Sequence, residues 1–238
     1  MRTVLITGGS RGIGAAMVRL FSKKGYRVAF TYKASKEAAE QISAETGALA
    51  ILADSASETD IISAVEKTEK ILGNVEILIN NAAVSSFSLI TDVTSEAWRA
   101  MFSVNVDAAF LYSKSVLPSM IRNRFGRIIN VTSMWGLVGS SCEVCYSSTK
   151  AALIGFTKAL AKEVGPSGIT VNAIAPGLID TDMNASLTDD DKSAIAEETP
   201  LMRMGTADEI AHAALFLASD DAAFITGDVM NVSGGFVV

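Results

Sequence analysis

The stretch Val4-Leu5-Ile6-Thr7-Gly8-Gly9-Ser10-Arg11-Gly12-Ile13-Gly14 decides the fold of this chain. A short apolar run predicts a buried strand, and the glycines after it open a helical segment. Glycines at that point let backbone N–H groups approach a pyrophosphate at the positive end of the helix. The turn therefore predicts a dinucleotide site lined by Gly8, Ser10, Arg11, Gly12, Ile13 and Gly14. Met17 stands where the commoner Gly-x-Gly-x-x-Gly spacing has its last glycine, so a tight turn without a ligand stays open for this motif alone.

Short runs rich in Val, Ile and Leu alternate with longer segments of helical period along the whole chain. This alternation predicts an α/β fold, a doubly wound Rossmann-type domain whose parallel sheet carries helices on both faces. The expected strands are Val4–Thr7, Val28–Tyr32, Ala48–Ala53, Glu76–Asn80, Arg127–Thr132, Thr170–Ala175 and Val229–Val232. The expected helices are Gly12–Lys24, Ser35–Thr46, Glu58–Leu72, Ser95–Asn123, Tyr146–Val164 and Ala207–Ala218.

Composition narrows the class of protein. The chain has 238 residues, of which 49% are hydrophobic and 19% charged, and we expect one globular domain over 1–238. No apolar run approaches the roughly 18 residues of a membrane span, and the start does not read as a secretory signal, so we expect a cytoplasmic protein. The net charge of −6 argues against nucleic acid or an anionic membrane as a partner.

The chain contains one histidine, His212. This count excludes a Ser-His-Asp triad and a multi-histidine metal site unless His212 alone serves, and its apolar surroundings favour a helix-packing role. Cys142 and Cys145 have the Cys-x-x-Cys spacing, but no second pair completes a zinc site. We therefore expect no metal.

The segment Asp182–Gly205 is the one long polar interruption of the α/β pattern. Segments of this length inside a compact domain are commonly functional, so we interpret 182–205 as a substrate lid, with a solvated excursion as the alternative.

The end of the second strand predicts the nicotinamide cofactor. In dinucleotide folds an acid there binds the adenosine ribose and repels a 2′-phosphate, but this strand ends Thr31-Tyr32-Lys33. With Arg11 in the turn, a cation about 4 Å from the phosphate contributes about 4 kcal/mol before desolvation costs. We therefore expect NADP(H) rather than NAD(H), held through Tyr32, Lys33 and Arg11. Lys33 and the nearby Lys36 could instead be ordinary surface residues of a loop and a helix start.

Tyr146 and Lys150 are four residues apart at the start of a helical segment, so both project from one face. Lowering a tyrosine pKa from about 10 by about three units needs about 4 kcal/mol, which one lysine together with an oxidised nicotinamide can supply. Tyr146 would then be a general acid for carbonyl reduction and a base for the reverse reaction. Ser133 follows a strand at the same predicted crevice, where its hydroxyl would bind the substrate carbonyl.

The chain resembles the short-chain dehydrogenase/reductase family over nearly its whole length. The resemblance rests on ordered motifs: Thr7-Gly-Gly-Ser-Arg-Gly-Ile-Gly14, Asp54, Asn80-Asn81-Ala82-Ala83, Asn105, Ser133, Tyr146-Ser-Ser-Thr-Lys150 and Pro176-Gly177 with Thr181. It implies a seven-stranded sheet of order 3-2-1-4-5-6-7 and a homotetramer or homodimer.

The same resemblance implies the roles of further residues. Asp54 would lie beside the adenine, with Asn81 and Ala82 along the adenosine half, although Asp54 could equally form a turn. Asn105 would hold a water of a proton relay, and Lys150 would also hold the nicotinamide ribose. After Pro176 and Gly177, Ile179 and Thr181 would bind the carboxamide.

Within the family the sequence is most similar to 3-oxoacyl-[acyl-carrier-protein] reductases. The expected function is therefore NADPH-dependent reduction of a 3-oxoacyl thioester, with Arg124 as a docking residue for an acidic acyl carrier protein. The second docking position carries Ser167 instead of a basic residue. Two alternatives stay open: a dehydrogenase of another secondary alcohol such as a steroid, sugar or small polyol, and a non-catalytic nicotinamide-binding regulator.

Overall fold

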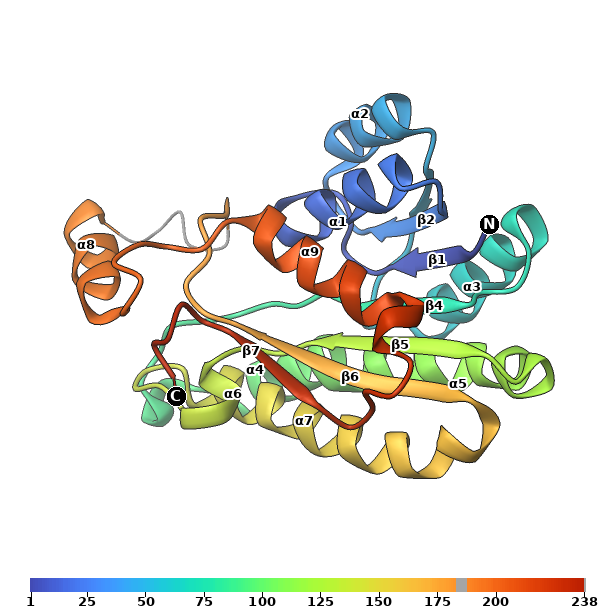
Figure 1. Ribbon diagram of the computed structural model, residues 1–238. Helices are drawn as coiled ribbons and strands as arrows, with labels where there is room; N and C mark the ends of the chain where they lie inside the picture. Colours follow the sequence, from blue (N-terminus) through green and yellow to red (C-terminus); the bar gives the residue numbers. More distant parts are fainter. Residues whose placement is uncertain (183–187, 238) are drawn as a thin grey trace.

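A computed structural model describes residues 1–182 and 188–237. Its centre is a seven-stranded parallel sheet of order β3-β2-β1-β4-β5-β6-β7, which confirms the predicted topology (Figure 1). The strands are β1 Thr3–Ile6, β2 Arg27–Tyr32, β3 Leu49–Leu52, β4 Ile77–Asn80, β5 Gly126–Val131, β6 Ile169–Pro176 and β7 Val229–Val232.

The order in which the chain adds strands to the sheet reverses at β1. This strand pairs with β2 on one side and with β4 on the other, so the connection that follows β1 and the connection that follows β4 run in opposite directions. In open α/β sheets, ligands bind at the carboxyl ends of the strands beside such a reversal. The glycine turn that follows β1 occupies this position.

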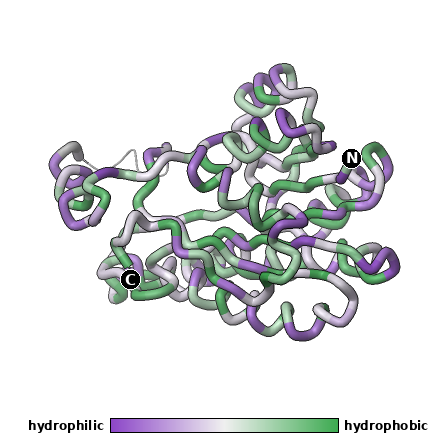
Figure 2. The backbone as a smooth tube through the Cα atoms, viewed as in Figure 1, coloured by the Kyte–Doolittle hydropathy of each residue, from purple (hydrophilic) through white to green (hydrophobic). Residues whose placement is uncertain are grey.

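Helices cover both faces of the sheet, which is why the strands are apolar without alternation. One core cluster joins the sheet to the helices α1 Gly12–Lys23, α2 Lys36–Thr46 and α9 Ala207–Ala218. The opposite cluster joins it to the helices α3 Glu58–Leu72, α5 Ala108–Asn123 and α7 Val144–Val164. Figure 2 shows hydrophobic segments running through the sheet, with hydrophilic segments more frequent on the outlying helices.

The expected helix over Ser95–Asn123 is wrong as one regular helix. It consists of α4 Ser95–Phe102, a π-helical turn at Ser103–Asp107, and α5. The turn contains Asn105, whose buried side chain is hydrogen-bonded to the backbone of Val84. A π-turn accommodates one extra residue, often at a functional site, and periodicity does not register it.

The polar segment 182–205 contains a helix that its composition did not predict. Helix α8 Asp189–Glu198 begins with a capping box, in which Thr188 and Asp191 exchange hydrogen bonds. Residues 183–187 of the expected lid lie outside the described residues. The segment returns to the body through a bridge between Ile179 and Gly205. Figure 1 shows α8 standing apart from the sheet.

A short helix, α6 Trp135–Val138, links β5 to α7. Across the parts of the chain that the structure describes, no helix has the length and apolar character needed to cross a membrane.

Candidate active site

The glycine turn after β1 is packed so closely that side chains do not fit. A Cβ on Gly8, whose φ is +68°, would lie 2.9 Å from the Cα of Ala82. A Cβ on Gly14 would lie 2.2 Å from the carbonyl oxygen of Gly8. Gly12 has a φ of +52°, which glycine adopts without strain. Backbone atoms, and not side chains, therefore line the interior of this glycine turn, which we call the cradle.

The amino end of α1 provides the chemistry that a pyrophosphate requires. Its N-cap residue, Arg11, makes no side-chain capping bond, and no acidic residue lies in the first turn Gly12–Ala15. The first N–H groups of the helix are thus left for an anion, which the helix dipole also favours. The buried Ser10 and the half-buried Ile13 flank this end. On these observations the predicted residues fit a dinucleotide.

Thr7 and Asn81 hold the cradle in place. The Oγ1 of Thr7 accepts the backbone N–H groups of Asn81 and Ala82, both at 2.9 Å. The side-chain amide of Asn81 donates to the carbonyl oxygens of Thr7 and Gly8 at 2.9 and 3.1 Å. Asn81, predicted to bind cofactor, thus braces the turn through its Nδ2. The role of Thr7 was not predicted, although a polar residue at the end of a buried strand is a usable signal.

Lys33 and Asp54, predicted to contact different parts of the cofactor, form an ion pair. The Nζ of Lys33 lies 2.7 Å from the Oδ2 of Asp54, because β2 and β3 end side by side. Asp54 also accepts the N–H of Ala56 at 2.9 Å, as expected for the turn-forming alternative. The Lys33 ammonium holds the pKa of the Asp54 carboxyl below its usual range. Tyr32 is half-buried at the end of β2.

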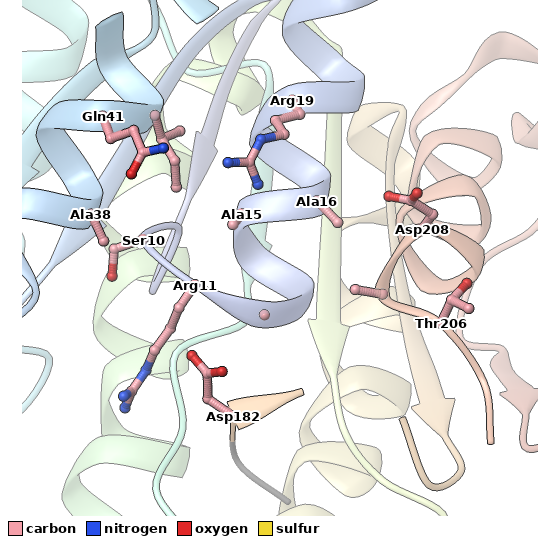
Figure 3. A pocket seen from close by; sticks show the side chains of 13 residues that line it. Ser10, Arg11, Ala15, Ala16, Arg19, Ala38, Gln41, Asp182, Thr206 and Asp208 are labelled. Carbon is pink, nitrogen blue, oxygen red and sulfur yellow. The ribbon is translucent and has the colours of Figure 1, made fainter. Parts of the chain in front are cut away.

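Arg11 extends into an open cavity of about 530 Å³ beside the cradle. Ser10 and Gly12 line the same cavity, with Arg19 further along α1. Figure 3 shows Ala38 and Gln41 on one side of α1, Thr206 and Asp208 on the other, and Arg11 reaching past Asp182. Among the described residues, Arg11 forms none of the ion pairs of the structure. Its guanidinium is therefore the unpaired cation nearest the cradle.

The structure brings Ser133, Tyr146 and Lys150 together. Ser133 lies just beyond the carboxyl end of β5, and the other two lie in the first turns of α7. All three are buried, and the Ser133 hydroxyl lies close enough to Tyr146 to influence the pKa of its phenol. The Nζ of Lys150 donates to the carbonyl oxygen of Val131 at 2.9 Å and lies 5.5 Å from the centroid of the Tyr146 ring.

Burial governs the protonation of this group. It raises the pKa of Tyr146 to about 12, to which the charge of Glu143 contributes, while the neighbouring Ser133 side chain acts in the opposite direction. It lowers the pKa of Lys150 to about 7. Lys150, whose Nζ lies 5.5 Å from the centroid of the Tyr146 ring, is placed to stabilise a Tyr146 phenolate when its amine carries a proton. Burial also raises the pKa of the Glu143 carboxyl. Glu143 was not predicted as part of the site.

Asn105 is buried next to the catalytic group. Its Oδ1 accepts the N–H of Val84 at 2.8 Å, and its Nδ2 donates to the carbonyl oxygen of Val84 at 2.9 Å and to Thr149 at 3.0 Å. Both side-chain donor hydrogens are therefore used, and the side chain ties the loop after β4 to α7. A water held by Asn105 would have to use its remaining acceptor sites.

The loop after β6 completes the crevice. Pro176 accepts the N–H of Met134, and Gly177 donates to Val232, so the loop is fixed to both neighbouring segments. Thr181 faces Gly12: a Cβ built there would lie 3.5 Å from Thr181. Ile179 is buried beneath the loop. Of the residues predicted to hold the nicotinamide, Thr181 thus borders the cradle, and Pro176, Gly177 and Ile179 lie at the end of β6 and in the loop that leads to it.

Three other residues lie apart from the catalytic group. Arg124 follows α5 and comes just before β5, whereas Ser133 comes just after β5. The two residues therefore lie at opposite ends of this strand. Arg124 donates to the carbonyl oxygen of Pro166, next to Ser167. His212 is exposed and not packed, and its Nδ1 bonds the backbone of Asp208 at 2.7 Å. The described residues hold no metal-binding group of three or more His, Cys, Asp or Glu.

Comparison with known proteins decides the family. The sequence model described as enoyl-(acyl carrier protein) reductase matches residues 8–237. The 3-oxoacyl-[acyl-carrier-protein] reductase FabG of Escherichia coli is 40% identical over 98% of this chain and 96% of its own. The chain belongs to the short-chain dehydrogenase/reductase family. An uncharacterized oxidoreductase of Bacillus subtilis, YmfI, is also 40% identical, over 99% of this chain and 98% of its own.

Solved structures agree with this assignment. A short-chain dehydrogenase/reductase mutant of Serratia marcescens is 34% identical with a TM-score of 0.94, over 100% of this chain and 98% of its own. A blue fluorescent protein from a metagenomic library, solved with NADPH, is 36% identical with a TM-score of 0.94 and the same coverage. As a member of the short-chain dehydrogenase/reductase family, the chain is an oxidoreductase acting on CH–OH groups.

Proposed function

We propose that this protein reduces the carbonyl of a 3-oxoacyl thioester to the 3-hydroxyacyl form, using NADPH. The observation that carries the proposal is the grouping of Ser133, Tyr146 and Lys150 at the carboxyl edge of β5, beside the glycine cradle. The name and 40% identity of the Escherichia coli reductase support the substrate class. The predicted cytoplasmic location stays a prediction.

Each catalytic side chain has a distinct role in the proposed reaction. When bound, the reduced nicotinamide supplies a hydride to the carbonyl carbon. Ser133 donates a hydrogen bond to the carbonyl oxygen, and its Oγ is oriented for this because it accepts the N–H of Trp135 at 3.1 Å. Tyr146 Oη gives its proton to the same oxygen, which leaves a hydroxyl on the product. Lys150 stabilises the phenolate that remains.

Selection of NADPH rests on Arg11 and on the absence of an acid at the end of β2. The unpaired guanidinium attracts a 2′-phosphate, and Lys33 neutralises the nearby Asp54. The NADPH bound to the similar blue fluorescent protein supports the same preference. Gly8, Gly12 and Gly14 hold the pyrophosphate against backbone N–H groups, and Thr181 with the Pro176-Gly177 loop holds the nicotinamide.

The position of Arg124 constrains the form of the substrate. Arg124 and Ser133 lie at opposite ends of β5. A carrier protein that docks on Arg124 would therefore deliver its substrate to the active site of a neighbouring copy of the chain. That arrangement requires the homodimer or homotetramer that the family resemblance implies. Charge reversal, Arg124→Glu, would then slow reduction of the carrier-bound substrate and leave the free thioester unaffected.

A second candidate is reduction of a small free ketone. The uncharged Ser167 at the second docking position and the distance of Arg124 from the site favour it. The decisive measurement is NADPH oxidation with acetoacetyl thioester, crotonyl thioester and a panel of secondary ketones, repeated with NADH. The crotonyl arm tests the enoyl reduction named in the family model's description.

Tyr146→Phe is the control for catalysis. Loss of the general acid lowers kcat by about 10²–10⁴-fold while NADPH still binds. Turnover of a small ketone without any 3-oxoacyl thioester reduction would replace the first candidate by the second. A Tyr146→Phe variant with full biological effect would instead indicate a nicotinamide-binding regulator.

A further inference from the structure

Trp135 connects the catalytic Ser133 to the segment that follows β7. Its backbone N–H donates to the Oγ of Ser133 at 3.1 Å. Its indole meets the ring of Phe236 edge-on, with centroids 5.5 Å apart and planes at 86°. Edge-to-face pairs of this kind stabilise a defined ring orientation. A residue distant in the sequence thus contacts the neighbour of the carbonyl-binding hydroxyl.

The helix that carries Trp135 has no freedom to move toward α7. A Cβ on Gly136 would lie 2.8 Å from the carbonyl carbon of Lys150, so the two backbones are already in contact. The Trp135 side chain also packs against the cluster that contains Met101, Cys145 and Tyr146. Trp135 is therefore held between the catalytic tyrosine's cluster and Phe236.

Phe236 is fixed by contacts outside α6. The N–H of Gly177 donates to Val232 at 3.0 Å, and a Cβ on Gly177 would lie 2.7 Å from the Cα of Ser233. Ser233 in turn accepts the N–H of Val237 at 3.3 Å. Figure 1 shows the end of the chain lying beside α6. These contacts hold residues 233–237 in a turn, and the turn sets the position of the Phe236 ring.

We infer that Trp135 and Phe236 form a wall of the substrate site that limits the size of the group attached to the reacting carbonyl. The inference rests on the proposed function and adds its specificity determinant. Phe236 keeps the indole in place, so a small alkyl group next to the carbonyl is accepted and a branched or aromatic group is excluded.

The test compares acetoacetyl thioester with its benzoylacetyl analogue. Phe236→Ala removes the ring, and Phe236→Leu keeps apolar bulk without the aromatic edge. Phe224→Ala is the matched control, because Phe224 is fully exposed. One methylene of pocket size is worth about 10–200-fold in selectivity. We therefore expect Phe236→Ala to raise the ratio of kcat/KM for the bulky over the small substrate at least about tenfold. Phe236→Leu should raise it less, and Phe224→Ala should leave it unchanged.

Tryptophan emission gives a readout that does not depend on turnover. The chain has two tryptophans, Trp98 and Trp135, so Trp98→Phe leaves Trp135 as the only reporter. In that background we expect Phe236→Ala to shift the emission to longer wavelength and Phe224→Ala to leave it in place. Melting temperatures identify variants that fail to fold, and Phe236→Leu keeps the test valid if Phe236→Ala is one of them.

Two results would overturn the inference. One is a selectivity ratio in Phe236→Ala that stays within about twofold of the wild type, well below the effect of one methylene. The other is an equal loss of kcat/KM with both substrates, accompanied by weaker binding of NADPH. That result would show that Phe236 supports the cofactor site and not the substrate site. If the wild type reduces no thioester, the proposed function fails. The wall is then tested with a methyl and a phenyl ketone, by turnover and by quenching of Trp135.

Discussion

The Nζ of Lys150 lies over the ring of Tyr146, 5.5 Å from its centroid, while it donates to the carbonyl oxygen of Val131. Burial moves the two pKa values in opposite directions, to about 7 for the lysine and about 12 for the tyrosine. At pH 8 the free protein therefore holds mainly a neutral amine beside a neutral phenol. The charge that activates the phenol arrives with the cofactor or with a proton on Lys150.

The Lys150 amine makes stability depend on pH. Its pKa is about 7 in the folded chain against an ordinary value of 10.5. Between these values the unfolded chain binds a proton that the folded chain does not, so the free energy of unfolding rises with pH. One such group contributes up to about 1.4 kcal/mol per pH unit. Urea unfolding at pH 7 and pH 9 should show a larger gain for the wild type than for Lys150→Met. Equal gains in the two proteins would contradict this.

Glu143 should set the pH at which the reverse reaction proceeds. Its negative charge raises the pKa of Tyr146, and alcohol oxidation requires the phenolate. Glu143→Gln removes the charge and keeps the shape, so the limb of the oxidation profile that rises with pH should move to lower pH. The measurement is kcat/KM against pH with a 3-hydroxyacyl thioester and NADP⁺. A limb that stays in place, or moves upward, would show that Glu143 does not act on the tyrosine.

The ion pair of Lys33 and Asp54 should govern NADPH affinity indirectly. Lys33→Met exposes the Asp54 carboxylate to the adenosine end of the site, and opposite or like charges about 4 Å apart interact by about 4 kcal/mol near a protein surface. We expect NADPH binding to weaken at least about tenfold. Adding Asp54→Asn should restore most of the affinity. Titration of both variants with NADPH and with NADH, which lacks the 2′-phosphate, separates this effect from unfolding. No recovery in the double variant would refute the explanation.

Thr7 should be necessary for the cradle itself. Thr7→Val keeps the shape but removes the acceptor of two partly buried N–H groups, those of Asn81 and Ala82. Each unsatisfied buried group costs about 1–3 kcal/mol, and these two are only partly buried, so the free energy of unfolding should fall by about 2 kcal/mol or more. Denaturant unfolding measures the loss, and NADPH titration should show weaker binding. Thr7→Ser is the matched control because it retains the oxygen. Equal stability of the valine and serine variants would rule out this role.

The sequence predicted the sheet well because its strands are buried on both faces. A run such as Val4–Ile6 has no polar face, and this pattern is typical of a parallel sheet. The order of the strands came from the family resemblance. Helix α8 was missed because half of its residues are acidic and its capping box uses Asp191 where the common signature has Glu or Gln.

The candidate site was predictable as a set of residues but less so as a set of contacts. Tyr146 and Lys150 share a helix face, so their proximity follows from spacing alone. The ion pair of Lys33 with Asp54 can be predicted only when β2 and β3 are known to be neighbours in the sheet. The contact between Trp135 and Phe236 joins two segments about 100 residues apart, and no local pattern encodes such a pair.

The π-helical turn at Ser103–Asp107 makes the length of this chain segment as important as its composition. An α-helix turns by about 100° per residue, so loss of one residue from the turn would rotate all of α5 by that angle relative to α4. The buried face of α5, which carries Tyr112, Val116 and Met120, would then leave the core. Substitutions of residues 103–107 other than Asn105 can therefore be tolerated where a single-codon deletion is not.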